Sequence, residues 1–279
     1  MKFGINTLLW GAAVGERDFD RLPAIRDAGF DGIEVPIFAP AEFPAAALRR
    51  ALARAGLDCT AVSILPGGSG LGDPDASARQ RAEEHLRAVI DRAAEAGIRL
   101  LSGPLYFPVG FLPGRRRTDD EWARAVEGWQ RLAPYAAAAA IDIGIEPLNR
   151  FETYFLNTAA DGVAFCEAVD HPAVGLLVDT FHANIEEKRI GDALRTAGRY
   201  LKHLHTCEND RGVPGSGHVE WREFFAAVGQ LGYDRWLTIE SFGFAAGALS
   251  AAAAIWRDLA PTPEAIAFEG IRFLRGHAV

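Results

Sequence analysis

The chain repeats one short pattern, in which an alanine-rich segment ends at a glycine and a run rich in strand-forming residues follows. The pattern occupies residues 25–35, 52–62, 92–102 and 228–240. The glycines at its junctions are Gly29, Gly56, Gly97 and Gly232. A helix often ends in a left-handed residue, which glycine adopts without the penalty that a Cβ atom imposes. The repeated unit is therefore predicted to be a helix, a turn and a strand.

Strand candidates recur along the whole chain. They begin near Lys2, Gly32, Asp58, Arg99, Ile141, Val174, Leu201 and Trp236. The intervals can each hold a helix, and residues 73–97 carry an apolar stripe, with Asp73 expected as the cap and Pro74 in the first turn. Eight alternating units predict an α/β fold, a single (β/α)8 TIM-barrel domain over residues 1–279. A doubly wound open sheet is the alternative, but no GxGxxG motif follows the first strand.

The net charge and the spacing of the cysteines indicate which partners and which cell compartment the chain suits. With 29 basic and 37 acidic residues the net charge is −8, which opposes binding to the phosphates of nucleic acid. The alanine-rich run 245–254 is too short to span a bilayer, and the first residues suit a strand better than a signal peptide. Cys59, Cys166 and Cys207 are scattered without CxxC spacing, as expected for reduced core thiols. We expect a cytoplasmic protein that binds neither nucleic acid nor membranes.

Two irregular stretches follow the third and fourth strand candidates, where barrel enzymes place active-site loops. The stretch 65–75 is rich in glycine but lacks the ending of a phosphate-binding loop. The stretch 104–120 contains Tyr106, Phe107 and Phe111, which either wall a pocket or cover the rim of the barrel. The roles of residues 104–120 and of Glu34, at the mouth of the second strand, stay open.

Acidic and imidazole side chains stand at the ends of the last four strand candidates. Alternate side chains of a strand share one face. If the isoleucines of residues 141–145 face the helices, Glu146 points inward at the mouth, and the same parity turns Asp179, His205 and Glu240 inward. Carboxylates this close repel one another unless a cation compensates. One imidazole and three carboxylates suit Mn²⁺, Mg²⁺ or Co²⁺ better than structural Zn²⁺, although each acid taken alone could be a solvated strand-end residue.

These side chains lie in motifs that resemble a known enzyme family. The motifs are IEPLNRFETYFLNT, DTFHANIEE, HTCENDRGVPGSGHVEW and TIESF, between residues 141 and 242. They are similar to the D-tagatose 3-epimerase and D-allulose (psicose) 3-epimerase family, within the xylose isomerase-like TIM barrels. The resemblance implies a ketose 3-epimerase acting on free ketoses of the D-tagatose/D-sorbose, D-fructose/D-allulose or L-ribulose type. It also implies a divalent metal, Mn²⁺ first with Co²⁺ or Mg²⁺ as alternatives, and a homodimer or homotetramer.

The resemblance also implies the roles of the strand-end residues. The metal ligands would be Glu146, Asp179, His205 and Glu240. Glu146 and Glu240 would lie on either side of the substrate's C3 atom, one removing its proton and the other returning a proton to the opposite face. Two groups are needed because a single base returns the proton only to the side from which it came. The intermediate between the two transfers would be a cis-enediolate.

Three further residues match family positions that bind the O1 to O3 end of the substrate. They are Glu152, His182 and Arg211. Each has an alternative interpretation, since Glu152 could be a surface acid, His182 a helix cap and Arg211 half of a loop salt bridge. His203 and His218 are expected outside the site, the first in the barrel interior and the second packing a loop.

Other activities are known on the same barrel, and the residues favour the epimerase over each of them. An inosose dehydratase or a hydroxypyruvate isomerase would share the metal, but the pair His182 and Arg211 favours the epimerase. A nuclease related to the AP endonucleases would need more strand-end histidines for three metals and a basic surface. A sugar-binding protein without activity would be expected to lack Glu146 or Glu240, and both are present.

Overall fold

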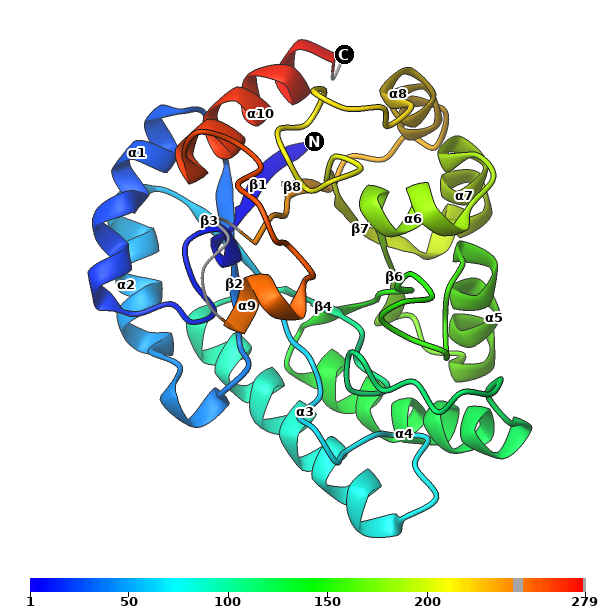
Figure 1. The fold of residues 1–279 in the computed structure, drawn as a ribbon. Coiled ribbons are helices and arrows are strands. Elements are labelled where there is room, and N and C mark those ends of the chain that lie inside the picture. Colours follow the sequence, from blue (N-terminus) through cyan, green and yellow to red (C-terminus); the bar gives the residue numbers. More distant parts are fainter. Residues whose placement is uncertain (243–247, 278–279) are drawn as a thin grey trace.

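The computed structural model describes residues 1–242 and 248–277, which form a closed barrel of parallel strands ringed by helices (Figure 1). The strands follow one another around the barrel in chain order. They are β1 (Lys2–Asn6), β2 (Gly32–Pro36), β3 (Asp58–Val62), β4 (Leu100–Gly103), β5 (Asp142–Ile145), β6 (Val174–Asp179), β7 (Leu201–His205) and β8 (Trp236–Ile239). The predicted TIM barrel is confirmed, and β4 and β5 each begin one residue later than expected.

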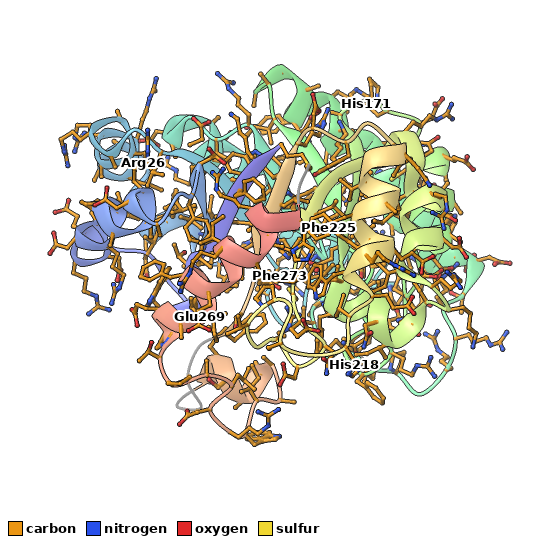
Figure 2. The ribbon with its side chains drawn as sticks, turned by 90° about the horizontal axis from the view of Figure 1, so that it is seen from above. Arg26, His171, His218, Phe225, Glu269 and Phe273 are labelled. Carbon is orange, nitrogen blue, oxygen red and sulfur yellow. The ribbon has the colours of Figure 1, made fainter. Side chains whose placement is uncertain are left out.

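Helices connect the strands and cover the outside of the barrel (Figure 1). They are α1 (Leu22–Asp27), α2 (Ala45–Ala55), α3 (Ala76–Ala96), α4 (Asp119–Ala138), α5 (Ala159–Val169), α6 (Thr180–Glu186), α7 (Ile190–Ala197), α8 (Trp221–Gln230), α9 (Ala248–Ala252) and α10 (Pro263–His277). The junction glycines all have a positive φ, between 60° at Gly232 and 100° at Gly29, as the repeated pattern predicts. Phe225 of α8 and Phe273 of α10, which Figure 2 labels, both contact the ring of His277 at the end of α10.

The cap of α3 differs from the expected one. The side chain of Asp75, not Asp73, accepts the hydrogen bond from the Ser77 backbone N–H. Asp73 instead accepts from the Asp75 backbone N–H at 2.8 Å, which closes a turn before the helix starts. This turn moves the cap two residues along the chain.

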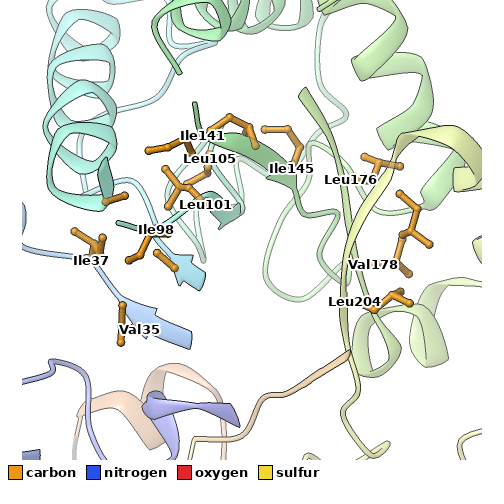
Figure 3. Close-up of a cluster of buried hydrophobic side chains, with 14 of the residues drawn as sticks. Val35, Ile37, Ile98, Leu101, Leu105, Ile141, Ile145, Leu176, Val178 and Leu204 are labelled. Atoms are coloured by element: carbon orange, nitrogen blue, oxygen red, sulfur yellow. The ribbon is translucent and has the colours of Figure 1, made fainter. Parts of the chain in front are cut away.

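The apolar core lies between the barrel and its helices. Figure 3 shows Val35, Ile145, Leu176 and Val178 among the side chains that fill this layer, each at most 5 % exposed. Their parity leaves the alternate residues of each strand to face the barrel axis. At Gly144 that space is tight, since a Cβ atom there would lie 2.7 Å from the Ser102 Oγ atom. The side chains that face the barrel axis are therefore closely packed.

The aromatic residues of the stretch 104–120 cover the rim. Tyr106 and Phe107 are buried and pack against Phe155, with ring centroids 5.3 Å and 5.1 Å away, whereas Phe111 is 45 % exposed. All three cysteines are free thiols, and only Cys59 is partly exposed. Within residues 1–242 and 248–277, no helix combines the length and the apolar character needed to cross a membrane.

Candidate active site

A cavity of about 140 Å³ opens at the carboxyl ends of the strands. Its polar lining consists of Ser63, Glu146, Glu152, His182, Arg211 and Glu240. The rest of its wall is largely apolar and includes Leu8, Phe38, Val62, Ile64, Val109, Leu148 and Phe242. The charged side chains lie close to one another and form the polar end of the cavity, within a wall that is otherwise largely apolar. Tyr106, Phe107 and Phe111 do not line it.

The strand-end residues that the parity argument selected come together beneath this cavity. One ligand atom from each of Glu146, Asp179, His205 and Glu240 lies within 4.8 Å of the others, and all four residues are buried. Asp179 and His205 are direct partners in the register of β6 and β7. Glu146 and Glu240 follow β5 and β8 immediately and reach the cluster from two different sides of the barrel.

Burial and mutual repulsion set the electrostatics of this cluster. Burial raises the pKa of Glu146, and the neighbouring charges of Glu240 and Asp179 raise it further. Burial also raises the pKa of Asp179, against the effect of Arg211. Burial alone would raise the pKa of Glu240 as well, but His205 and Arg211 outweigh it and lower the pKa overall. With all three carboxyl groups ionised, the cluster would carry more negative charge than a buried site holds without added cations.

Arg211 supplies one positive charge to the cluster. Its Nη1 atom donates to Glu240 Oε2 at 2.8 Å and to Asp179 Oδ2 at 3.2 Å. The guanidinium also lies over the rings of Phe181 and Phe242, with its Cζ atom 4.2 Å and 4.7 Å from their centroids. Arg211 is buried and has a left-handed φ of 63°. It lines the cavity, and its ion pairs with Asp179 and Glu240 are buried.

Glu208 shapes the loop that presents Arg211, and the motif analysis did not single it out. Its buried carboxylate accepts hydrogen bonds from the backbone N–H groups of Asn209, Gly215 and Val219 and from Trp221 Nε1, at 2.7–3.1 Å. A glutamate three residues after β7 and before a glycine-rich loop was the available signal.

His182 points one N–H group into the cavity. The backbone N–H of Asn149 donates to His182 Nδ1 at 3.1 Å, and burial, followed by the charge of Arg211, lowers the pKa of His182 well below its usual value. The ring is therefore neutral with its proton on Nε2. That atom lies 3.7 Å from Glu146 Oε1 and 3.2 Å from Arg211 Nη2. Two N–H donors, one from His182 and one from Arg211, thus converge on the same part of the cavity.

Asn149 is a second residue that the motif analysis missed. Its Nδ2 atom lies 2.8 Å from Glu152 Oε1 and 2.9 Å from His182 Nδ1, so it links two cavity residues. Its Oδ1 atom accepts from the Phe151 backbone N–H, which fixes the orientation of the amide. Burial raises the pKa of Glu152, against the effects of Arg211 and Asn149. Its position in the same motif, three residues before Glu152, was the only sequence signal.

The stretch 104–120 holds the rim around two cavity residues. Tyr106 Oη donates to the Glu146 carbonyl oxygen at 2.8 Å, and the Gly110 backbone N–H donates to the Glu152 carbonyl oxygen at the same distance. Arg115 closes the stretch onto Glu121 at the start of α4 through two hydrogen bonds of 2.9 Å and 2.8 Å. The stretch therefore holds the backbone of Glu146 and Glu152 in place, and it also contributes Pro104 and Val109 to the cavity wall.

Glu34, His203 and His218 lie away from the cavity wall. Glu34 and His203 are fully buried in the barrel interior, and neither lines the cavity. His218 is exposed in the loop before α8 (Figure 2). Burial alone would raise the pKa of Glu34, but the charges of His205 and His203 and their hydrogen bonds lower it overall.

The donor set of the cluster fits a divalent cation. His205 Nδ1 is buried and has no hydrogen-bond partner among the residues that the structure describes. It lies 3.4 Å from Glu240 Oε2 and 3.9 Å from Asp179 Oδ2. A buried polar atom normally has a partner, and carboxylates with one imidazole are the donors that Mn²⁺, Co²⁺ and Mg²⁺ accept. These four residues could hold such an ion.

Comparison with known proteins gives one consistent result. Residues 22–277 match the model of the xylose isomerase-like TIM barrel family. A probable ketose 3-epimerase of Synechocystis sp. is 36 % identical, over 99 % of this chain and 96 % of that protein. An L-ribulose 3-epimerase of Mesorhizobium japonicum is 35 % identical, over 92 % of this chain and 88 % of that protein. The crystal structure of a Methylomonas sp. D-allulose 3-epimerase with D-allulose superposes with a TM-score of 0.94 at 30 % identity, covering 99 % and 97 % of the two chains.

Proposed function

The chain belongs to the xylose isomerase-like TIM barrel family as a ketose 3-epimerase, and we propose that it interconverts C3 epimers of free ketoses by proton exchange through a cis-enediolate. One observation carries the mechanism. Glu146 and Glu240 come from β5 and β8 and both line the cavity. Inversion at carbon needs a proton acceptor on one face and a proton donor on the other, and these two carboxyl groups supply both.

The two glutamates exchange roles between the two directions of the reaction. One carboxylate removes the C3 proton, and the other, in its acid form, delivers a proton to the opposite face of the planar enediolate. After the transfer each group holds the protonation state that the reverse reaction requires. Neither group needs to move, because both already border the same cavity.

His182 and Arg211 bind the oxygen atoms next to the reacting carbon. Their N–H groups converge at the polar end of the cavity, where they donate to a substrate oxygen that gains negative charge during proton removal. Glu152 lies at the same end and accepts from a substrate hydroxyl group. These contacts orient C3 between the two glutamates.

We assign the divalent metal to Glu146, Asp179, His205 and Glu240. The fit of this donor set and the unpartnered Nδ1 atom of His205 support the assignment. When bound, the ion would supply Lewis-acid polarisation of the C2 carbonyl group and stabilise negative charge on O2 and O3. Mn²⁺ is our first choice, and Co²⁺ and Mg²⁺ suit the same donors.

The lining of the cavity favours a free sugar over a sugar phosphate. Arg211 is the one Arg or Lys residue among the lining residues of the described chain, and it is already bonded to Asp179 and Glu240. The rest of the wall is built largely of apolar side chains such as Leu8, Phe38 and Val109. A phosphate group there would lose its hydration without gaining a cation. D-Allulose/D-fructose, D-tagatose/D-sorbose and L-ribulose are therefore the substrates to test first.

The proposal also covers the oligomeric state and the cellular location of the protein. We propose a single-domain subunit of residues 1–279 that forms a homodimer or homotetramer. Support comes from the family resemblance and from the exposed apolar side chains of Phe151 and Trp256, 70 % and 76 % accessible in one chain. We propose a cytoplasmic location because Cys59, Cys166 and Cys207 are all free thiols.

The decisive experiment is deuterium incorporation. The protein is incubated with Mn²⁺ in D₂O with each of the candidate ketoses, and the sugars are analysed by NMR. We expect deuterium at C3 together with the C3 epimer. If no ketose acquires deuterium at C3, the epimerase mechanism is wrong. Formation of an aldose or of a dehydrated product instead would assign the protein to another reaction of the same barrel family.

A further inference from the structure

Glu34 lies directly beneath the proposed metal site and has no part in the mechanism so far. It stands on β2, in register with Asn6 of β1 and Thr60 of β3. Both of its oxygens are fully used: Oε1 lies 2.6 Å from His205 Nε2 and 3.0 Å from Asn6 Nδ2. Oε2 lies 2.9 Å from Thr60 Oγ1 and 2.8 Å from His203 Nε2. This carboxylate therefore joins four side chains from three other strands.

The direction of these hydrogen bonds follows from Asn6. The Oδ1 atom of Asn6 accepts from the Leu8 backbone N–H at 2.9 Å, so its Nδ2 group must face Glu34. An ionised carboxylate only accepts, and therefore His205 donates to it from Nε2. An imidazole that binds a metal must be neutral and then carries one N–H group, so with Nε2 protonated the Nδ1 atom of His205 presents its lone pair. This is the same Nδ1 atom that faces Glu240 and Asp179 without a hydrogen bond to any described residue.

We propose that Glu34 is a positioning residue of the metal centre, which holds His205 with Nε2 protonated so that Nδ1 can bind a divalent cation. The inference rests on the metal site of the proposed function. Metal-bound histidines commonly donate their second N–H group to a carboxylate, which fixes the ring and makes the ligating nitrogen more basic. Glu34 does not line the cavity, so it acts on the metal site and not on the sugar.

The same carboxylate also reaches a second proposed ligand. Asn6 Nδ2 donates to Glu240 Oε1 at 3.2 Å as well as to Glu34, and this fixes the side of Glu240 that faces away from Arg211. Glu34 thereby orients His205 directly and Glu240 through Asn6. Although Glu34, His203 and His205 themselves lie close enough to hold a metal, both imidazole Nε2 atoms are engaged with the Glu34 carboxylate. We therefore interpret that group as a hydrogen-bonded support and not as a second metal site.

Cobalt binding tests the inference without relying on turnover. Metal-free wild-type protein and the Glu34→Gln variant are titrated with Co²⁺, and binding is followed by visible absorption and by calorimetry. The glutamine keeps the size and a carbonyl acceptor but removes the negative charge. We expect Co²⁺ affinity to fall about 10-fold to 100-fold, with an altered visible spectrum of the bound ion.

Thr60→Val is the matched control. It removes one hydrogen bond to the same carboxylate, but at Oε2, whereas His205 is bound at Oε1. We expect its Co²⁺ affinity to stay within about threefold of wild type, well inside the loss expected from Glu34→Gln. Equal affinity of wild type and Glu34→Gln, or equal losses in Glu34→Gln and Thr60→Val, overturns the inference and leaves the proposed function standing.

Two further results of the Co²⁺ titrations would also bear on the role of Glu34. If Glu34→Gln shows no cooperative unfolding, Glu34→Asp replaces it, because the shorter side chain keeps the charge but withdraws from His205. We expect weakened Co²⁺ binding there too, and wild-type affinity in a folded Glu34→Asp protein overturns the inference. If the wild-type protein binds no Co²⁺, the metal site of the proposed function fails and this inference fails with it.

Discussion

The guanidinium of Arg211 donates to the carboxylate of Glu240 at 2.8 Å, inside the group of acids that we propose as metal ligands. The same nitrogen reaches Asp179 at 3.2 Å, so one fixed cation offsets part of the buried negative charge. The negative charge that Arg211 does not offset requires a second cation. Arg211 and the proposed metal are therefore expected to stabilise the protein through the same carboxylates.

Replacing Arg211 by methionine tests this relationship. The change leaves Asp179 and Glu240 buried without a hydrogen-bonded cation, and we expect a loss of about 3–5 kcal/mol in the free energy of unfolding in the presence of a chelator. Added Mn²⁺ should restore part of this loss. Denaturant unfolding with and without Mn²⁺ measures both effects. Arg131→Met, which breaks the exposed pair with Glu83, is the control and should cost less than about 1 kcal/mol. An Mn²⁺ effect no larger in Arg211→Met than in wild type would contradict the shared role.

The two-base mechanism makes a prediction for each glutamate separately. We expect Glu146→Gln and Glu240→Gln each to lower kcat for epimerisation by at least about 10²-fold, the usual contribution of a positioned acid or base. The base that remains can still remove a proton from its own face and return deuterium there. Residual C3 exchange should therefore retain configuration, which NMR in D₂O distinguishes from inversion. Near-normal epimerisation in either variant would remove the mechanism.

Metal removal should weaken both activity and stability. A cation that binds only the folded protein stabilises it by about 2.7 kcal/mol at a free concentration 100 times its Kd. We expect chelator treatment to abolish turnover and to lower the Tm by several degrees, and Mn²⁺ or Co²⁺ to reverse both changes. Calorimetry and an activity assay on the same samples check this. Activity that is indifferent to chelation would count against a catalytic metal.

The sequence allowed the barrel to be predicted because its signals are local. A junction glycine such as Gly97 marks the end of a helix, and the alternation in β5 decides which residues face the barrel axis. The alternation of inward and outward side chains also predicted that Asp179 and His205 lie close together, because the ends of neighbouring parallel strands meet at the same edge. Two aspartates, Asp73 and Asp75, stand at the start of α3, and the cap predicted at Asp73 is wrong because Asp75 caps the helix.

The supporting residues could not be predicted because they depend on contacts between distant loops. Asn149 and His182 lie 33 residues apart, and nothing local indicates that the amide would meet the imidazole. The left-handed φ of Arg211 follows from the loop that Glu208 holds, and not from its own residue type. The role of Glu34 could not be predicted for a similar reason, because its partner His205 lies 171 residues further along the chain.

The link made by Asn149 can be tested through substrate binding. Asn149→Ala removes the amide that joins Glu152 and His182 but leaves the backbone N–H that donates to His182. We expect KM to rise about tenfold, equivalent to about 1.4 kcal/mol, because Glu152 is no longer held in place. Asn149→Asp should be worse than Asn149→Ala, since it adds a like charge beside Glu152. Steady-state kinetics check both, and an Asp variant that performs better than the Ala variant would contradict this role.

The charge of Glu121 should make the stability of the rim depend on pH. It is buried at the start of α4, where it completes the capping box with Thr118 and accepts hydrogen bonds from Arg115 and Tyr154. The hydrogen bond from Arg115 contributes most to lowering its pKa, which falls from 4.5 to about 2. A lowered pKa in the folded state adds stability that is fully present above the unfolded value of 4.5 and is lost as the pH falls toward about 2. Glu121→Gln should therefore be less stable than wild type at pH 7 by roughly 2 kcal/mol, after allowance for the exposed side of Arg115.

The difference between the two proteins should shrink between pH 4.5 and about 2, because the wild-type carboxyl group then becomes protonated. Urea unfolding at pH 7, 4 and 3 measures it, with Glu84→Gln as the control because Glu84 is an exposed acid on α3. Removing that charge should change the unfolding free energy by no more than about 0.5 kcal/mol at any of these pH values. A Glu121→Gln deficit that stays constant from pH 7 to pH 3 would show that packing, and not the charge of Glu121, holds the rim against α4.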